Sequence, residues 1–200
     1  ILASLAGQAH AVAPNLRGYE RSSAPAEVSA YRVKHLVADL VALIGALGGP
    51  LDVLVAHDWG GAVGWALAAQ HPQLVIVNST HPGTFLRELR VSPQQQLASR
   101  YMNFLARPDA AAMLRANDYA RLWPFFTGDH GAPWLDAATK QSYREVWNRG
   151  LDGALNWYRA SPLRPALSAN DPLHTLALPP EMLSVNLPTT VIWGDGDRAL

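Results

Sequence analysis

Apolar residues follow two different spacings in the first part of the chain, and each spacing predicts one kind of element. Residues 51–56 and 74–78 are short, nearly continuous apolar runs, which is typical of strands that are buried on both faces. Residues 27–47 and 62–70 have the composition and spacing of helices. In the longer helix the apolar side chains share one face: Val33, Leu36, Val37, Leu40, Val41 and Ile44. Helices and strands in this order predict a parallel sheet covered by helices.

The segments before residue 27 are less regular. Residues 1–8 are expected to be the last turns of a helix, and residues 10–14 a short strand of the same sheet. A loop that is dense in turn-forming residues follows at 15–25. Because the chain begins at Ile1 inside an expected helix and ends just after an expected strand, we expect a domain that is incomplete at both ends.

The pattern changes between residues 83 and 182, where no convincing strand is predicted. Helical spacing occurs there in four stretches: 93–105, 108–115, 136–149 and 153–159. An apolar strand pattern returns only at Thr189–Trp193. A block of helices inserted between two strands predicts a cap. We therefore expect an α/β core at 1–82, a helical cap at 83–182 and a return to the core at 183–200.

Composition narrows the possible functions. The 200 residues are 49% hydrophobic and 16% charged, with a formal net charge of zero, which is ordinary for a globular domain. Because there is no run of Lys or Arg, binding to nucleic acid or to an anionic membrane is not expected. The longest apolar stretch, Leu36–Leu47, contains Asp39 and is too short to cross a bilayer. The absence of Cys excludes disulfides and thiolate metal sites and agrees with a cytoplasmic location.

The strongest chemical signal is Ala56-His57-Asp58-Trp59-Gly60, which lies between an apolar strand and a helix. It has the form small–x–nucleophile–x–small of a nucleophile elbow, a sharp turn that lifts its central side chain above the sheet. With Asp58 in place of the usual Ser, the expected chemistry is displacement at an sp³ carbon, which produces an alkyl–enzyme ester. The helix N-terminus would help to keep Asp58 ionised, and the backbone N–H of Trp59 would form half of an oxyanion hole. The alternative is that Asp58 only caps the helix.

This elbow resembles that of the epoxide hydrolases, a family of α/β-hydrolases, and that of their relatives, the haloalkane and fluoroacetate dehalogenases. Three other segments are similar to the same group: residues 13–25, residues 78–82 and Trp193–Asp197. The resemblance implies the α/β-hydrolase fold with an inserted cap, and it makes Asp197 the acid of a catalytic triad. Asn15 and Glu20 depart from the family's pattern, which has Asp and Gly at these positions.

Two tyrosines favour epoxide chemistry. The runs Leu155–Arg159 and Tyr101–Pro108 are similar to the two cap segments that each carry a catalytic tyrosine in epoxide hydrolases, which points to Tyr158 and Tyr101. A phenol can donate a proton to the alkoxide that forms when an epoxide opens. The opening of epoxides to vicinal diols is therefore the leading interpretation.

A haloalkane or haloacid dehalogenase with the same Asp nucleophile is the alternative enzyme class. Dehalogenases bind the departing halide with ring N–H groups, for which Trp59 is one candidate; Trp147 and Trp157 are others, although packing explains these two more readily. A catalytically incomplete or non-catalytic protein that keeps the fold is a third interpretation.

The resemblance implies a two-step reaction that needs no cofactor or metal. Asp58 attacks an epoxide carbon while Tyr101 and Tyr158 protonate the oxygen, and water activated by a histidine that Asp197 holds then hydrolyses the ester. We expect a small epoxide or alkyl halide as the substrate, no nucleic-acid or membrane partner, and a monomer or homodimer.

Two parts of the family's pattern fall outside the 200 residues. One is the triad histidine, because all seven histidines precede Asp197: His10, His35, His57, His71, His81, His130 and His174. The other is a strand, with a His-Gly-x-Pro segment after it, that would lie between the strands expected at 10–14 and 51–56. The 200 residues alone are therefore expected to be alkylated once at Asp58 without turnover.

Overall fold

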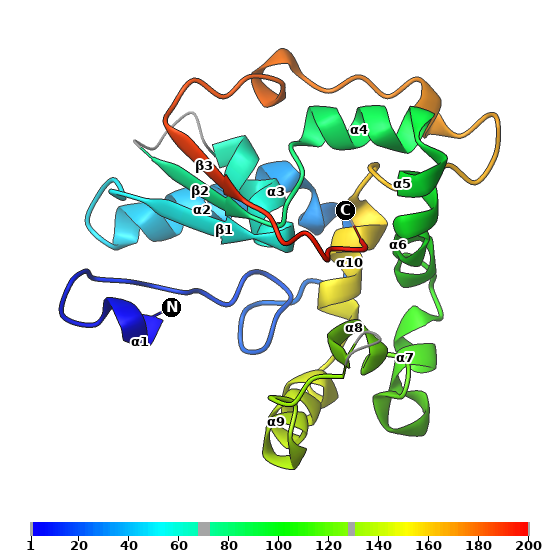
Figure 1. The fold of residues 1–200 in the computed structure, drawn as a ribbon, viewed down its shortest axis with the longest axis horizontal. Helices are drawn as coiled ribbons and strands as arrows, with labels where there is room; N and C mark the ends of the chain where they lie inside the picture. Colours follow the sequence, from blue (N-terminus) through cyan, green and yellow to red (C-terminus); the bar gives the residue numbers. More distant parts are fainter. Residues whose placement is uncertain (1, 68–72, 128–130, 200) are drawn as a thin grey trace.

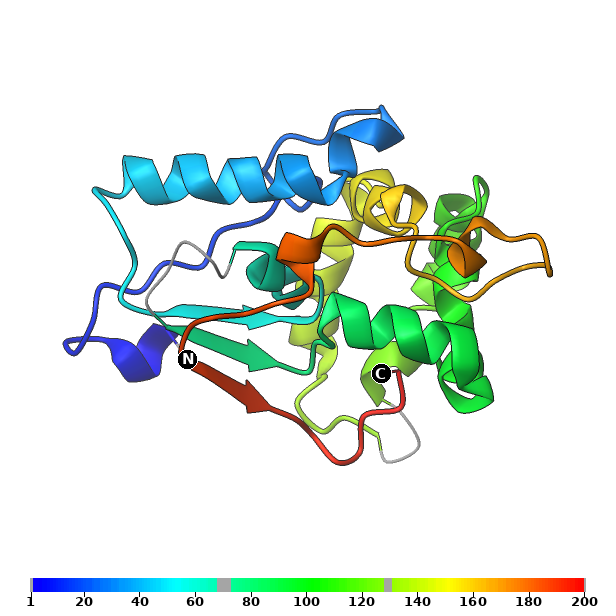
Figure 2. The same cartoon turned by 90° about the horizontal axis from the view of Figure 1, so that it is seen from above.

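A three-stranded parallel sheet forms the centre of the protein (Figures 1 and 2). The computed structural model describes residues 2–67, 73–127 and 131–199. The strands lie in the order β1-β2-β3, with the bounds Leu54–His57, Leu74–Val77 and Thr189–Ile192. Both pairings are parallel, so that His57, Val77 and Ile192 end side by side at one edge of the sheet. The parallel sheet predicted from the sequence is confirmed.

Two helices with apolar stripes are layered on this sheet. The helix α3 (Asp58–Leu67) packs directly against β1 and β2, and α2 (Val33–Ala46) packs on α3. The helix and the strand approach closely at Gly64, where a Cβ atom would lie only 2.9 Å from the Cβ of Ala56. A short 3-10 helix, η1 (Val28–Tyr31), replaces the first turns of the helix that the sequence predicts from residue 27.

The chain between β2 and β3 is helical over much of its described part. The bounds of its helices are α4 Pro82–Val91, α5 Pro93–Ala98, α6 Arg100–Leu105, α7 Ala110–Tyr119, α8 Pro124–Thr127, α9 Ala137–Asn148, α10 Asp152–Ala160, η3 Pro172–His174 and η4 Pro180–Met182. Figure 1 shows α4 to α10 beyond one end of the sheet, whereas η4 packs on α3. One apolar cluster, which includes Leu114 and Leu155, joins α7 and α10; a second, which includes Leu89 and Met102, joins α4 and α6. Helices thus fill the interval in which the sequence predicts them.

The strand predicted at residues 10–14 does not form. This segment runs outside the sheet (Figure 1), and none of the described strands lies beside it to exchange backbone hydrogen bonds. An apolar run becomes a strand only when a neighbouring strand satisfies its backbone donors and acceptors. The preceding helix is also shorter than predicted, because α1 is limited to Leu2–Leu5.

Two other helices differ from their predicted bounds. The helix expected at 62–70 begins earlier, at Asp58, and residues 68–70 lie outside the described part of the chain. The stretch 93–105 is two helices, because Ser99 leaves the helical conformation and separates α5 from α6. Because the apolar spacing continues across Ser99, the sequence pattern did not indicate the break between α5 and α6.

The helices α4 and α8 were not predicted. In α4, Pro82 occupies the first position, and the Nδ1 atom of His81 accepts a hydrogen bond from the backbone N–H of Gly83 at 3.3 Å. Pro at the first position is a known feature of a helix start, so part of the signal for α4 was present in the sequence. The helix predicted at 108–115 continues to Tyr119 through a kink, where Asn117 has a φ of +51°.

Candidate active site

Asp58 lies at the sharp turn where β1 ends and α3 begins, at the position that the elbow motif predicts. Its φ of +49° is in the left-handed region, which Asp tolerates better than most residues that carry a side chain. Such a conformation costs on the order of 1–3 kcal/mol and persists only where the surrounding structure holds it. The turn therefore needs support from its neighbours.

Ser79 supplies part of that support from the segment that follows β2. Its hydroxyl donates to the backbone oxygen of Asp58 at 2.8 Å, and its side chain is only 4% exposed. A Cβ atom at Gly61 would lie 2.3 Å from the Cβ of Ser79, whereas one at Gly60 would meet open space. The elbow therefore requires a small residue at Gly61, and the sequence analysis was wrong to place this requirement at Gly60.

The carboxylate of Asp58 is accessible to solvent, but the surrounding protein displaces much of its water. This desolvation is the main reason that the pKa of Asp58 is raised above its usual value, and the charge of Asp197 adds to the effect. The backbone N–H of Trp59, which donates to Oδ2, and the nearby His57 oppose the shift. The helix N-terminus thus favours the ionised form, as expected, but desolvation outweighs it.

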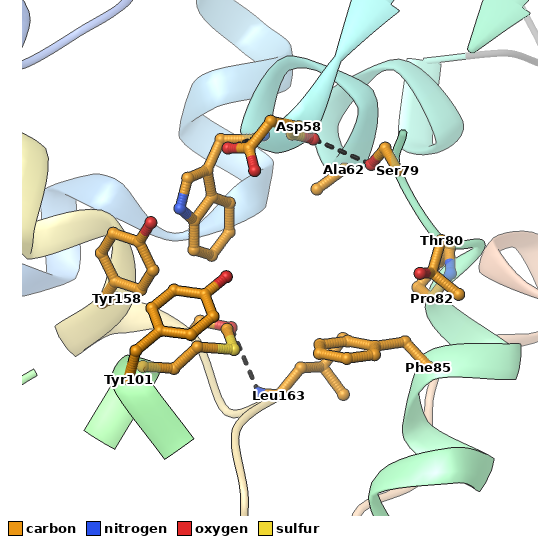
Figure 3. Close-up of a pocket in the computed structure, with 12 residues that line it drawn as sticks. Asp58, Ala62, Ser79, Thr80, Pro82, Phe85, Tyr101, Tyr158 and Leu163 are labelled. Atoms are coloured by element: carbon orange, nitrogen blue, oxygen red, sulfur yellow. Dashed lines mark hydrogen bonds between the residues drawn. The ribbon is translucent and has the colours of Figure 1, made fainter. Parts of the chain in front are cut away.

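A cavity of about 80 Å³ opens beside Asp58 and is lined mainly by apolar atoms (Figure 3). Its walls come from α3, the segment after β2, α4, α6 and α10, and they include Asp58, Trp59, Phe85, Tyr101, Met102 and Tyr158. Four of the five site residues that were predicted from the sequence therefore line the same cavity. The fifth, Asp197, lies close enough for its charge to act on both Asp58 and Tyr101.

The two phenols come from different helices, Tyr101 from α6 and Tyr158 from α10, and Figure 3 shows both oxygens directed toward the Asp58 side of the cavity. Desolvation, followed by the charge of Asp58, raises the pKa of Tyr101 to about 12. The same two causes raise the pKa of Tyr158 well above its usual value, partly offset by a hydrogen bond with the side chain of Trp59. Both residues are therefore protonated phenols over the whole neutral range.

Edge-to-face contacts connect the rings around the cavity into one row. The ring centroids are 5.8 Å apart for Tyr19 and Trp157, 5.6 Å for Trp157 and Trp59, and 5.2 Å for Trp59 and Tyr158. Tyr101 follows at 6.2 Å from Tyr158. The row links the loop at 15–25 to α3, α10 and α6, and packing of this kind fixes ring orientation.

The helix that carries Tyr158 is held against the loop at 15–25. Gly18, which has a φ of +86°, and Gly153 of α10 meet backbone to backbone: a Cβ on Gly153 would lie 2.4 Å from the oxygen of Gly18. Four residues farther along α10, the indole N–H of Trp157 donates to the backbone oxygen of Arg17 at 2.8 Å. Neither contact was predicted from the sequence, because a single glycine does not indicate a partner so distant along the chain.

The two departures from the family's pattern in this loop contact each other. The amide of Asn15 donates to the carboxylate of Glu20. Glu20 has a φ of +46°, a left-handed conformation that explains why the family's pattern has Gly at this position. The hydrogen bond helps to hold Glu20 in this unfavourable conformation.

Asp197 lies in the turn that follows β3. Its Oδ2 accepts a hydrogen bond from the side-chain amide of Asn78 at 2.6 Å, and its Oδ1 accepts one from the backbone N–H of Ala199 at 2.9 Å. Asn78 directly follows β2, and the next residue is Ser79, whose hydroxyl donates to the backbone oxygen of Asp58. The sequence analysis gave no role to Asn78 or Ser79, although polar residues that directly follow a buried strand are a recognisable signal.

No group of three or more His, Asp or Glu residues suited to a metal ion occurs among the described residues. Within the same residues, no helix is both long enough and apolar enough to span a membrane.

Comparison with known proteins identifies the family. The family model described as alpha/beta hydrolase fold matches residues 1–200. The AB hydrolase superfamily protein YfhM of Bacillus subtilis is 32% identical over 196 residues, which cover 94% of this chain and 64% of the relative. Epoxide hydrolase 4 of Mus musculus is 30% identical over 198 residues, which cover 93% of this chain and 52% of the relative.

A solved structure agrees with these relatives. Bacillus megaterium epoxide hydrolase in complex with an inhibitor has a TM-score of 0.84 and 29% sequence identity to this chain, and the match covers 100% of this chain and 71% of the other. The chain spans about half to two thirds of the length of the two curated relatives. The chain therefore belongs to the α/β-hydrolase fold family, in the group that includes the epoxide hydrolases.

Proposed function

We propose that this protein is an epoxide hydrolase, which opens an epoxide to a vicinal diol through an ester on Asp58. One observation carries the proposal: the carboxylate of Asp58 and the phenols of Tyr101 and Tyr158 lie around the same cavity, which is largely apolar. Ring opening needs a nucleophile on carbon and a proton donor on oxygen at the same time. The similarity to epoxide hydrolases supports this chemistry.

In the first step, one carboxylate oxygen of Asp58 attacks an epoxide carbon. Because Oδ2 is held by the N–H of Trp59, the attacking atom is Oδ1. A C–O bond forms, the ring C–O bond breaks, and the epoxide oxygen takes a proton from Tyr101 or Tyr158. The phenolate that remains recovers its proton from solvent.

The charge of Asp58 couples these two events. While Asp58 is ionised, its charge is one of the causes that raise the pKa of both phenols. Ester formation removes that charge from Asp58 and places it on the epoxide oxygen. The phenols therefore become stronger acids at the moment when the developing alkoxide needs a proton.

In the second step, water attacks the carbonyl carbon of the Asp58 ester. The resulting oxyanion is on Oδ2, where the N–H of Trp59 already donates a hydrogen bond and can stabilise it. A histidine held by Asp197 takes the proton of the water; in the family pattern it follows Asp197 in the sequence. Collapse of the intermediate breaks the bond between the carboxyl carbon and Oδ1, which takes that proton and leaves as a hydroxyl of the diol. The oxygen of the water remains on Asp58 and restores its carboxylate.

We also propose that residues 83–182 act as a cap domain over a core formed by 1–82 and 183–200. Asp58 and Asp197 then belong to the core, and Tyr101 and Tyr158 to the cap. Substrate would bind between the two parts, with the nucleophile below it and the proton donors above it.

The dehalogenase alternative needs ring N–H groups that face the substrate. Trp157 donates its N–H to the backbone oxygen of Arg17, and Trp147 packs against Trp123 with ring centroids 4.7 Å apart. Neither is among the residues that line the cavity. Of the three candidate tryptophans, only Trp59 lines the cavity. Because a halide site needs more than one ring N–H group, this favours an epoxide as the substrate.

Trapping the ester tests the proposal. We expect rapid acid quenching after incubation with styrene oxide to leave the mass of one epoxide on the peptide that contains Asp58, and a chloroalkane to leave none. Asp58→Asn should abolish the adduct. Asp52→Asn, which changes an exposed carboxylate close to the start of β1, should preserve it. An adduct from the chloroalkane alone would favour a dehalogenase. The absence of both adducts would favour a non-catalytic protein.

A further inference from the structure

Asn78 holds the turn that contains Asp197. It directly follows β2, the middle strand, and its amide donates to Asp197 Oδ2 at 2.6 Å. Its backbone N–H donates to the oxygen of Ile192, the last residue of β3, at 3.0 Å. Its side chain also covers Gly194, where a Cβ would lie 3.6 Å from the amide nitrogen. One residue thus contacts the turn at its beginning, along its length and at the carboxylate.

The opposite side of the same turn is held by helices. The backbone oxygen of Ala199 accepts hydrogen bonds from Gln95 at 3.1 Å and from the buried hydroxyl of Ser99 at 3.3 Å, while its N–H donates to Asp197 Oδ1. The carboxylate of Asp197 therefore has a donor on each oxygen, one from the end of β2 and one from its own turn. Hydrogen bonds to both oxygens limit how the carboxylate can rotate.

The neighbour of Asn78 contacts the other acidic residue, at its backbone rather than at its carboxylate. Ser79 donates to the backbone oxygen of Asp58, so two consecutive residues of one segment each hold one acidic residue. This follows from the sheet order, since β2 lies between the strand that leads to Asp58 and the strand that leads to Asp197. The end of the middle strand thus contacts both acidic residues, the carboxylate of Asp197 and the backbone of Asp58.

We propose that Asn78 is a positioning residue, which orients the carboxylate of Asp197 for the hydrolysis of the Asp58 ester. This rests on the proposed function, because Asp197 acts only in its second step. Removal of the amide leaves Asp58 and the two phenols in place but takes away the donor on Oδ2, so the carboxylate of Asp197 is held less firmly. The first step should then continue, and the second should slow.

The test is single-turnover kinetics with styrene oxide in the protein at its full natural length. We expect Asn78→Gly, which suits the φ of +44° at this position, to form the ester within about twofold of the wild-type rate. Because the lost hydrogen bond involves a charged group, hydrolysis of the ester should slow by about 10-fold to 100-fold. Its pH profile should also shift to lower pH, since a base that loses contact with a carboxylate becomes weaker.

A matched substitution separates this effect from a general loss of stability. Asn117 is exposed, has a φ of +51° and lies in the kink of α7, so Asn117→Gly makes the same change away from the site. It should leave both steps unchanged. If Asn78→Gly does not fold, Asn78→Ala replaces it: this substitution removes the donor without adding a charge and should show the same selective loss.

Three results would contradict the inference. Unchanged hydrolysis in the Asn78 variants would show that the amide does not matter, and an equal slowing of both steps would indicate a merely structural role. Formation of no ester by the wild-type protein would refute the proposed function itself and, with it, the role of Asn78. The first two results leave the proposed function intact, so a failure of the inference about Asn78 can be distinguished from a failure of the proposed function.

Discussion

Two adjacent glycines in the elbow should respond in opposite ways to the same substitution. Gly61→Ala would place a Cβ 2.3 Å from the Cβ of Ser79 and 2.4 Å from its hydroxyl oxygen. Real Cβ contacts stay above 3.0 Å, so Ser79 or the helix has to move by more than half an ångström. Gly60→Ala introduces the same methyl group into open space.

The expected magnitude follows from what each methyl group disturbs. Overpacking of a buried contact costs about 1–3 kcal/mol. Displacement of Ser79 also breaks its hydrogen bond to Asp58, which contributes about 1 kcal/mol. The gain in helix propensity from Gly to Ala is shared by both variants and cancels. We therefore expect Gly61→Ala to be less stable than Gly60→Ala by about 2–4 kcal/mol.

Thermal unfolding followed by circular dichroism measures this difference directly. For a protein of this size, 1 kcal/mol corresponds to roughly 2–4 °C in Tm, so the two variants should differ by roughly 4–16 °C. Urea unfolding provides an independent value. Equal Tm values for the two variants, or a lower value for Gly60→Ala, would refute the assignment of the close contact to Gly61.

Three further substitutions test other parts of the site. Asp58→Asn should raise the Tm at pH 7: because the pKa of Asp58 is raised in the folded state, its ionised carboxylate opposes folding, and the difference should vanish once the pH falls below the usual carboxyl pKa of 3.8. Tyr101→Phe should slow ester formation by about 10-fold to 100-fold, measured by quenched-flow mass spectrometry, because one proton donor is lost. With Tyr101 present, this rate should not fall near pH 10, since its pKa is raised to about 12. Gly153→Ala should push α10 away from Gly18 and reduce activity by roughly 100-fold, whereas Gly45→Ala, whose Cβ meets nothing within 4 Å, should leave activity unchanged.

Elements whose signal is local were predictable from the sequence. The strands β1, β2 and β3 coincide with short apolar runs, and α9 and α10 lie within a residue or two of the predicted stretches. The turn at Asp58 was also predictable, because its motif is local, although the residue that must be small is Gly61 rather than Gly60. The strand expected at 10–14 shows the limit: its composition is suitable, but pairing with a neighbouring strand decides whether it forms.

Contacts between distant parts of the chain could not be predicted in this way. Asn78 and Asp197 are 119 residues apart, and only the order of the strands brings them together. In the sequence, Gly153 is an ordinary residue near the start of a helix, and only the structure shows that it contacts Gly18. The sequence thus indicated which side chains could carry chemistry, while the residues that hold them became visible only in three dimensions.

The row of rings beside the nucleophile has an optical consequence. Trp59 lines the same cavity as Asp58 and contacts both Tyr158 and Trp157, so its indole lies near the carboxylate whose charge would disappear in the proposed ester. Indole emission responds to a nearby charge, which makes Trp59 a built-in fluorophore for the proposed reaction. Each catalytic cycle would then be visible as a rise and fall of intrinsic fluorescence, without any label attached to the protein or the substrate.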